Sequence, residues 1–308
     1  MPKECAMILC CGEALIDMLP RETATGETAF APYPGGAVFN TAIALGRLGA
    51  PAGFFSGIST DLFGAMLDGA LATSDVDASL ARRSDRPTTL AFVTLTEGQA
   101  RYAFYDENTA GRMLTEADLP ALPDAARALF FGGISLVVEP CGAAYQALMA
   151  RAAPDRLTMI DPNIRPGFIT DEARYRKRLA AMLAQADIVK TSDEDLHWLT
   201  GGHDPAALDT GAALILMTRG AEGVTAHMGG TVFDMPAHKA QVVDTVGAGD
   251  TFNAGLLAGL DRAGLLDKSA LRAADPDALR PAIDLGMRAA AITVSRAGAN
   301  PPWAQELT

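Results

Sequence analysis

Short apolar runs alternate along the chain with segments whose apolar residues recur at helical spacing. This alternation is typical of βαβ units. It predicts an α/β protein with a mostly parallel sheet whose two faces are covered by helices. The predicted strands are Met7–Cys11, Gly53–Ile58, Leu129–Gly132, Leu157–Asp161, Ile188–Lys190, Leu214–Thr218 and Val224–His227.

Two segments between these runs are clearly amphipathic. In Val38–Leu48 and in Gly249–Arg262 the apolar residues form one stripe with the spacing of a helix. Such a stripe predicts a helix that packs one face against the sheet. The stripe residues are Phe39, Ala42, Ile43 and Gly46 in the first segment and Phe252, Leu256 and Leu260 in the second.

Two stretches in the first third of the chain depart from this alternation. Residues Met18–Pro34 contain few apolar side chains, and Thr88–Tyr105 has two β-rich arms around the turn Thr96–Gln99. The second stretch predicts a β-hairpin with no helix after it. The sequence contains no repeat and no linker between two halves. We therefore expect one large domain with a small β appendage.

Length and charge narrow the function classes. At 308 residues the chain is about twice a typical domain length, which fits two domains or one large domain with an appendage. The 25 Lys and Arg residues against 37 Asp and Glu residues give a net charge of -12. So acidic a chain has no general attraction for nucleic acid or anionic lipid. Both are excluded as partners bound by bulk charge.

No apolar run reaches the roughly 20 residues of a membrane span, so no membrane segment is expected. Glu13 and Asp17 interrupt the apolar N-terminal stretch, which therefore does not fit a signal peptide. The cysteines show neither zinc spacing nor an extracellular framework, and we expect reduced, buried thiols in the cytoplasm. They are Cys5, Cys10, Cys11 and Cys141.

The most informative motif is VVDTVGAGDTFNAG, from Val242 to Gly255. Gly247, Ala248 and Gly249 stand where a helix begins, so their backbone N–H groups can converge on an anion at the positive end of the helix dipole. Asp250 follows in the first helical turn. There it could accept a proton from a hydroxyl that attacks a phosphoryl group. The alternative is that Asp250 only caps the helix and the glycines only turn the chain.

A second glycine motif, PGGAVFNTAIALGRLG, runs from Pro34 to Gly49. Gly35 and Gly36 precede an amphipathic helix whose first turn carries Asn40. The glycines allow a polar ligand to approach the backbone, and Asn40 offers both a donor and an acceptor to hydroxyl groups. The alternative is a tight connection between a strand and a helix.

Together, the two motifs resemble the two signatures of the ribokinase-like (PfkB-type) carbohydrate kinases, and fructokinase-type members most of all. The resemblance runs along the whole chain. It implies a single domain over residues 1–308, with three αβα layers around a mostly parallel central sheet. It also implies a small β-stranded lid formed by about residues 13–34 and 88–111.

The resemblance assigns roles to the motif residues. Asp250 corresponds to the catalytic base and Gly247, Ala248 and Gly249 to the anion hole. Asp17 corresponds to the carboxylate that grips sugar hydroxyls. The remaining sugar-site residues are Gly35, Gly36 and Asn40.

The resemblance also implies ATP and Mg²⁺ as cofactors. Thr218, Gly220 and Gly223 match the nucleotide-binding turn, while Ser192 and Asp195 stand where the family often has Asn and Glu near magnesium. Because Asp is one methylene shorter than Glu, we expect Asp195 to reach the metal through water. The alternative is an acidic surface patch over residues 193–195.

Asp244 resembles part of a monovalent-cation site that many members contain, so K⁺ is a further expected cofactor. Such a cation would order the loop of the anion hole. No other residue of the site is visible in the sequence.

The resemblance favours ATP-dependent phosphorylation of a primary hydroxyl of a small sugar, with fructose first. The rival substrate is 2-keto-3-deoxygluconate, whose carboxylate could be held by Arg165 with Tyr102 or Tyr105. Ile164 replaces the tyrosine usual before that arginine, which favours fructose. Other sugars and nucleosides of the same family remain open.

Two other classes of protein fit the motifs less well. A non-catalytic sensor would be expected to lack the base or the anion hole, and both are present. A dinucleotide oxidoreductase would need Gly-x-Gly-x-x-Gly after the first strand, which is absent.

Exposed strand edges in the lid predict a homodimer through the lid.

Overall fold

The computed structural model describes residues 6–96 and 99–307, with the side chains of 94–102 outside this description. Across these residues, one large sheet has the strand order β15-β14-β13-β12-β11-β10-β1-β4-β6. Its strands are β1 (Met7–Cys11), β4 (Ala52–Phe55), β6 (Val76–Asp77), β10 (Ala126–Gly132), β11 (Leu157–Asp161), β12 (Ile188–Ser192), β13 (Leu214–Thr218), β14 (Val224–Met228) and β15 (Thr231–Met235).

In this order the seven strands β6, β4, β1, β10, β11, β12 and β13 run parallel to one another, and β14 and β15 are added antiparallel at the edge beside β13. All seven strands expected from apolar runs are present, the one at Gly53–Ile58 in altered form. The parallel arrangement places the carboxyl ends of the central strands along one edge of the sheet, where α/β proteins bind their ligands.

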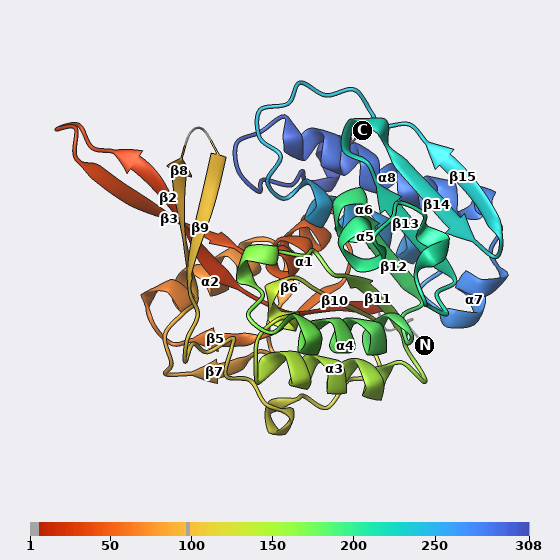
Figure 1. The fold of residues 1–308 in the computed structure, drawn as a ribbon, viewed down its shortest axis with the longest axis horizontal. Coiled ribbons are helices and arrows are strands. Elements are labelled where there is room, and N and C mark those ends of the chain that lie inside the picture. The colour runs from red at the N-terminus through yellow and green to blue at the C-terminus, as the bar shows by residue number, and fades with distance from the viewer. Residues whose placement is uncertain (1–5, 97–98, 308) are drawn as a thin grey trace.

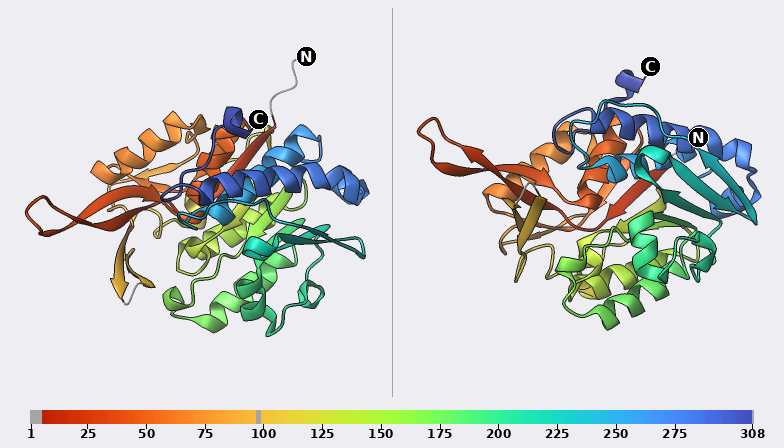
Figure 2. Two further views of the ribbon diagram at one scale, coloured as in Figure 1. Left: turned by 90° about the horizontal axis from the view of Figure 1, so that it is seen from above. Right: turned by 45° about the horizontal axis from the view of Figure 1, so that its top comes forward.

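Helices cover both faces of this sheet (Figures 1 and 2). The alternation of side chains along β1 shows why: Ile8 and Cys10 belong to one buried cluster, and Leu9 and Cys11 to another. One face packs against α1 (Ala37–Arg47), α2 (Leu62–Thr73), α6 (Ala248–Arg262), α7 (Lys268–Ala273) and α8 (Pro276–Val294), and the other against α3 (Cys141–Ala152), α4 (Glu172–Leu183) and α5 (Asp193–Thr200). The three-layer αβα architecture is confirmed.

The central helix α6 is buried along most of its length. Gly255 and Gly259 allow close contact with α8, since a Cβ at either position would lie 2.5 Å from a Cα atom of Gly286 or Ala282. This packing fixes α6 so that its first turn lies at the carboxyl edge of the sheet, where the GAGD motif was expected to act.

A second sheet, with the order β3-β2-β8-β9, joins the two stretches that departed from the βαβ alternation. Its strands are β2 (Leu15–Glu22), β3 (Thr28–Gly35), β8 (Leu90–Thr96) and β9 (Gln99–Tyr105). Strands β8 and β9 form the expected hairpin, whose turn residues 97–98 lie outside the described residues. The β2–β3 arm projects from the body of the molecule (Figures 1 and 2). The use of this sheet as a lid stays a prediction.

One predicted strand, Gly53–Ile58, is divided in the structure. Its first part is β4, while β5 (Gly57–Ser59) leaves the large sheet and pairs with β7 (Arg82–Ser84). The backbone at Ala110 lies against this second part, because a Cβ at Gly57 would lie 2.0 Å from the Ala110 carbonyl oxygen. Short 3₁₀ helices complete the chain: η1 (Glu116–Asp118), η2 (Ile134–Leu136), η3 (Pro166–Phe168), η4 (Pro205–Ala207), η5 (Gly220–Glu222) and η6 (Ala304–Leu307).

None of the helices in residues 6–96 and 99–307 has the length and apolar character needed to cross a membrane. Cys10, Cys11 and Cys141 are buried free thiols, as expected, and Cys5 lies outside the described residues.

Candidate active site

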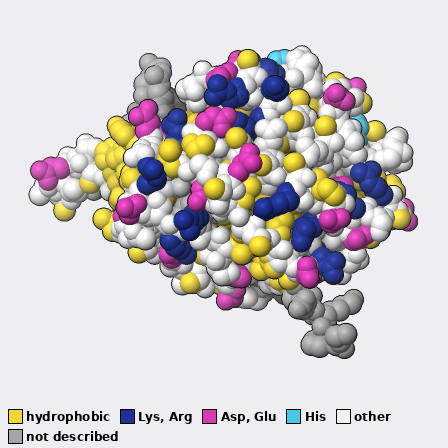
Figure 3. All heavy atoms as spheres, turned by 90° about the horizontal axis from the view of Figure 1, so that it is seen from below, with side chains coloured by type: hydrophobic (Ala, Val, Ile, Leu, Met, Phe, Trp, Pro, Cys, Tyr) yellow, Lys and Arg dark blue, Asp and Glu magenta, His cyan; other side chains and the backbone are white. Residues whose placement is uncertain are grey.

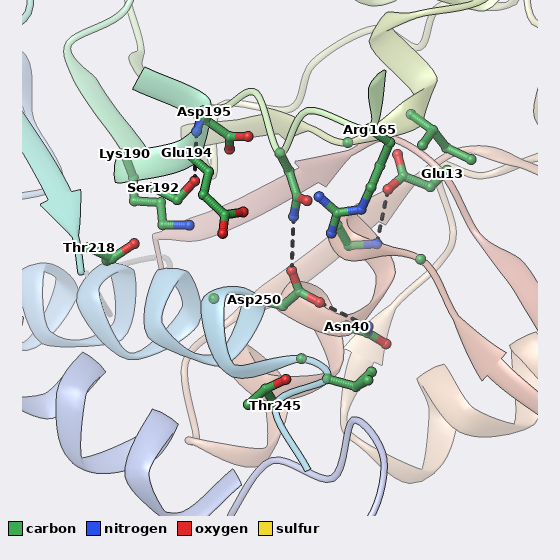
Figure 4. Close-up of a pocket in the computed structure, with 18 of the residues that line it drawn as sticks. Glu13, Asn40, Arg165, Lys190, Ser192, Glu194, Asp195, Thr218, Thr245 and Asp250 are labelled. Atoms are coloured by element: carbon green, nitrogen blue, oxygen red, sulfur yellow. Dashed lines mark hydrogen bonds between the residues drawn. The ribbon is translucent and has the colours of Figure 1, made fainter. Parts of the chain in front are cut away.

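A cavity of about 560 Å³ lies at the carboxyl edge of the large sheet, between that edge, the second sheet and the first turns of α1 and α6 (Figure 4). It gathers residues from segments far apart in the chain. Those that the sequence assigned are Asp17, Gly36, Asn40, Arg165, Ser192, Asp195, Thr218, Gly220, Gly247, Gly249 and Asp250.

Asp250 lies in the first turn of α6, is 7% exposed and faces this cavity. Asn40 Nδ2 donates to Asp250 Oδ2 at 2.9 Å, and Asn163 Nδ2 donates to Asp250 Oδ1 at 3.5 Å. Burial raises the pKa of Asp250 to about 7, although the Asn40 hydrogen bond opposes the shift. A carboxylate with a pKa near neutrality is suited to accept a proton from a hydroxyl.

The turn before α6 leaves several N–H groups free. Gly247 is the N-cap of α6 with φ 78°, and a Cβ there would lie 2.7 Å from the Ala299 Cβ. Within the described residues, no acceptor takes the N–H of Gly247, Gly249 or Asp250. The N–H of Ala248 donates to the Thr245 carbonyl at 3.3 Å. An anion can therefore be held by the N–H groups on either side of Ala248, rather than by that of Ala248 itself.

The residues expected to bind sugar lie on one side of the cavity. Asp17 belongs to β2, and the absence of a side chain at Gly35 leaves room for its carboxylate: a Cβ there would lie 2.1 Å from Asp17 Oδ2. Burial raises the pKa of Asp17 to about 6. Gly36 is the N-cap of α1 with φ 107°, and Asn40 follows one turn later. The structure therefore brings together Asp17, Gly36 and Asn40, with Gly35 beside them.

Glu13 is a cavity residue that the sequence analysis did not assign. Its Oε1 accepts the N–H of Ala37 at 2.9 Å, and its Oε2 accepts the N–H of Ser135 at 3.2 Å. Burial raises its pKa. The carboxylate thus joins the start of α1 to the start of η2. The sequence showed Glu13 as a charged residue within an apolar stretch. It did not show that the carboxylate binds the N–H groups of Ala37 and Ser135.

The DPNIRP segment supplies Asn163 and Arg165 to the cavity. Arg165 is exposed and points inward from the loop after β11 (Figure 4), while its Nη1 donates to the Ile164 carbonyl at 3.0 Å. Asn163 has a left-handed backbone, φ 46°, which turns its side chain to Asp250. Arg165 was predicted from the sequence to be a substrate residue, whereas Asn163 was given no role.

Lys190, which the sequence analysis also left unassigned, is a buried cation at the cavity wall. Its Nζ lies 2.9 Å from Asp161 Oδ2, and both side chains are nearly inaccessible. Asn253 Nδ2 also donates to Asp161 Oδ2, at 2.8 Å. Burial alone would lower the pKa of Lys190, but Asp161 raises it above its ordinary value, so the side chain stays charged.

A second cavity of about 630 Å³ adjoins the first and shares Thr218, Gly220, Thr245 and Gly249 with it. Its other walls are mainly apolar and small, which suits a flat aromatic base. Gly223, with φ 104°, lines this second cavity, and a Cβ there would lie 2.1 Å from the Met235 carbonyl oxygen. The apolar wall residues are Ala221, Val224, Ala237, Ala240, Val242, Ala248, Phe252, Met287, Ala290, Ala291 and Val294.

Ser192 and Asp195 lie at the boundary between β12 and α5. Ser192 Oγ accepts the N–H of Asp195 at 3.0 Å and so caps α5, and Asp195 Oδ1 accepts the N–H of Ile164 at 3.1 Å. Burial raises the pKa of Asp195 to about 6. Glu194 also points into the cavity (Figure 4). Within residues 6–96 and 99–307, no three His, Cys, Asp or Glu side chains converge as a metal cluster.

Asp244 ties the loop before α6 to the loop after α8. Its Oδ1 accepts the N–H of Val246 at 3.0 Å, and its Oδ2 accepts the N–H of Gly298 at 2.9 Å. Asp244 therefore holds the loop of the anion hole through these two N–H groups, and its role in a K⁺ site stays a prediction.

One expected substrate residue does not reach the cavity. Tyr105 is 63% exposed, packs against Phe92 and lines a separate hollow. Side chains alternate along β9, so its neighbour Phe104 is the one that lines the cavity. The expectation that Tyr105 faces the substrate is thus not supported. The Tyr102 side chain lies outside the described residues.

Comparisons with known proteins show which proteins this chain is similar to. The model of the pfkB family carbohydrate kinases matches residues 6–306. A fructokinase from Rhizobium leguminosarum bv. trifolii is 55% identical over 279 residues, 89% of this chain and 86% of that protein.

Two solved structures share the fold. Fructokinase with bound ATP from Xylella fastidiosa has a TM-score of 0.89 and 28% identity, covering 98% of this chain and 97% of that one. Aminoimidazole riboside kinase from Salmonella enterica, complexed with aminoimidazole riboside and an ATP analog, has a TM-score of 0.84 and 25% identity, covering 98% of both chains. The chain therefore belongs to the pfkB family of carbohydrate kinases, phosphotransferases with an alcohol group as acceptor.

Proposed function

We propose that this protein is a fructokinase, which transfers the γ-phosphoryl group of ATP to a primary hydroxyl of fructose. The observation that carries the proposal is the contact between Asn40 and Asp250. The Asp250 carboxylate lies between a polar site, formed by Asp17 and the start of α1, and free N–H groups at the start of α6, which supports its role as the proton acceptor.

The reaction balances with these groups alone. The sugar hydroxyl oxygen attacks the γ-phosphorus, its proton passes to Asp250, and the bond from the γ-phosphorus to the bridging oxygen breaks. The electron pair of that bond leaves with ADP. The N–H groups of Gly247, Gly249 and Asp250 stabilise the negative charge on the phosphoryl oxygens.

The two adjoining cavities suit the two substrates. The apolar cavity would take the base, and Thr218 and Gly220 at its boundary would lie beside the ribose and phosphates. Asp17 accepts two hydroxyl hydrogens, and Asn40 both donates and accepts. Closure of the second sheet over the sugar would exclude water and suppress hydrolysis of ATP.

The donor set fits Mg²⁺. This ion is often held by one or two carboxylates together with substrate phosphates and water. Asp195 and Glu194 offer such carboxylates beside Ser192, with Asp195 acting through water. Bound there, Mg²⁺ would neutralise charge on the phosphates. For Asp244 we propose a structural role at a K⁺ site next to the anion hole.

Fructose is favoured over 2-keto-3-deoxygluconate by two observations. The relative with 55% identity is named a fructokinase. Tyr105 lines another hollow, so one side chain that would help Arg165 to hold a carboxylate is turned away. The intact base and anion hole give no support to a non-catalytic sensor.

We further infer a homodimer that forms through the second sheet. Tyr33 and Tyr105 on this sheet are 43% and 63% exposed. Figure 3 shows hydrophobic side chains gathered at the base of the projecting β2–β3 arm, whereas acidic and basic groups mix over the rest of that face.

We place the protein in the cytoplasm because its proposed phosphoryl donor is ATP.

The test is a coupled assay of ADP release with fructose, 2-keto-3-deoxygluconate, ribose and aminoimidazole riboside, with Asp250→Ala as the inactive control. Fructose should give the highest kcat/KM. A higher value for another sugar would reject fructose, and no acceleration by any sugar would reject the kinase mechanism. Because selective binding must stabilise the native state, the preferred sugar should also raise Tm most in the presence of an ATP analogue.

A further inference from the structure

The cavity is strongly acidic for a site that must take a polyanion. Among the side chains that the structure describes, two basic ones line it, Arg165 and Lys190, and Arg165 is the exposed one. Lys190 is only 4% exposed. A charge in such a place acts with little screening by water. The acidic side chains of the cavity are Glu13, Asp17, Asp193, Glu194, Asp195 and Asp250.

Strand alternation explains where Lys190 points. Ile188 on the same strand packs in the cluster that α6 covers, and Lys190 lies two residues further on. Its side chain therefore faces the start of α6, toward the interior of the cavity (Figure 4). A Cβ at Gly249 would lie 3.2 Å from Lys190 Nζ, so the ammonium lies against the anion-hole glycine.

The ammonium has unused donors. Lys190 Nζ makes one hydrogen bond within the described residues, to Asp161 Oδ2. An ammonium has three N–H donors, so two remain for a ligand. Asn253 on α6 donates to the same oxygen of Asp161. The carboxylate that holds the lysine is therefore fixed by both the sheet and α6.

We propose that Lys190 is a further catalytic residue, which donates to the transferred phosphoryl group while Asp161 and Asn253 hold its ammonium in place. This inference rests on the proposed use of ATP. It explains why residue 249 has no side chain: an oxygen at this point can meet both the Gly249 N–H and the lysine. Because the phosphoryl group carries negative charge spread over its three equatorial oxygens as it passes from ADP to the sugar, a fixed cation beside it stabilises the transition state.

A purely structural role for Lys190 makes a different prediction. Removing one partner of a buried ion pair leaves an uncompensated charge and destabilises the fold, whereas removing both can be tolerated. The double variant Lys190→Met with Asp161→Asn removes both charges. If the lysine serves the fold alone, the double variant should regain Tm and nucleotide affinity together.

The experiment measures binding by calorimetry, using ADP and a non-hydrolysable ATP analogue. We expect Lys190→Met to weaken the analogue at least tenfold and ADP less than threefold, and the double variant to regain Tm but not analogue affinity. Lys190→Arg should recover part of the affinity. The matched control is Lys177→Met on the exposed face of α4.

Equal losses for ADP and the analogue in Lys190→Met, or recovery of analogue affinity in the double variant, would overturn the proposal. So would analogue affinity equal to that of Lys177→Met. The wild-type sugar assay is run in parallel, because a wild type that binds the analogue but phosphorylates no sugar rejects the proposed function alone. If sugars are phosphorylated while Lys190→Met binds like the control, the inference about Lys190 alone fails.

Discussion

Asn40 and Asp250 are 210 positions apart in the chain, and the amide of Asn40 donates to the carboxylate of Asp250 at 2.9 Å. The contact joins the first turn of α1 to the first turn of α6. Each glycine motif alone is explained by a turn before a helix. Because Asn40 from one motif binds the carboxylate of Asp250 from the other, the two motifs form one site.

Replacing Asp250 with Asn should remove proton acceptance while leaving the shape of the site intact. We expect kcat to fall by roughly 10²- to 10⁴-fold, the usual contribution of general-base catalysis, with sugar affinity changed only a few-fold. Steady-state kinetics and calorimetry with the sugar check this. Asp261→Asn, near the other end of the same helix, is the matched control and should keep wild-type kcat. Retention of most activity by Asp250→Asn would contradict the assignment.

The same substitution should change how stability depends on pH. Burial raises the pKa of Asp250 to about 7, above the value of about 4 in an unfolded chain. Between these values the native state binds more protons, so this group's contribution to stability is lost as pH rises. Asn cannot ionise. The Tm of Asp250→Asn relative to wild type should therefore be higher at pH 8.5 than at pH 5.5, and an equal difference at both would contradict the shift.

Much of the large sheet was predictable because its strands are buried on both faces. The predicted strands Leu157–Asp161 and Leu214–Thr218 coincide with β11 and β13. Strand β15 was not predicted, since its residues are exposed or half-buried and form no apolar run. The break between β4 and β5 was not predicted either, because β5 pairs with β7, more than twenty residues further along the chain.

The site residues also fall into those that the sequence predicts and those that it does not. Asp250 and its glycines were predictable because they are contiguous in the sequence and stand where a helix begins. The free N–H groups of a helix start can bind an anion. Lys190 was not, because its partner Asp161 is 29 positions away and sequence does not show which face of a strand meets α6. Glu13 acts on groups 24 and 122 positions away. Contacts between residues so far apart in the sequence can be identified only in the folded structure.

Removing the amide of Asn40 should shift the acid limb of the pH–rate profile. The Asn40 hydrogen bond lowers the pKa of Asp250 against the effect of burial. In Asn40→Ala that pKa should rise, so the limb of kcat/KM should move to higher pH. A profile of kcat/KM for the sugar between pH 5.5 and 9 checks this. An unmoved limb, or one moved to lower pH, would show that Asn40 does not tune the base.

Gly35→Ala should damage sugar binding through Asp17. The new Cβ would lie 2.1 Å from Asp17 Oδ2, so the carboxylate must move. Hydrogen bonds to charged groups contribute about 1.5–3 kcal/mol, so we expect the sugar KM to rise roughly tenfold or more with little change in the ATP KM. Gly69→Ala on α2, where a new Cβ meets nothing within 4 Å, is the control. Equal effects on both KM values would argue against the sugar role of Asp17.

Glu13→Gln tests whether a carboxylate positions the sugar side of the site. Each oxygen of Glu13 accepts one backbone N–H, at Ala37 and at Ser135. Gln offers one oxygen and one NH₂ group, so one N–H at a helix start loses its acceptor, which costs about 1–3 kcal/mol. We expect a lower Tm.

Because α1 carries Asn40, the sugar KM of Glu13→Gln should also rise, while affinity for ADP should stay unchanged. The matched control, Glu22→Gln, lies at the exposed end of β2 and should behave as wild type. If Tm falls but the sugar KM does not rise, Glu13 serves only the fold. If ADP affinity falls as much as sugar affinity, the damage extends to α6, and the separation of the sugar side from the nucleotide side is wrong.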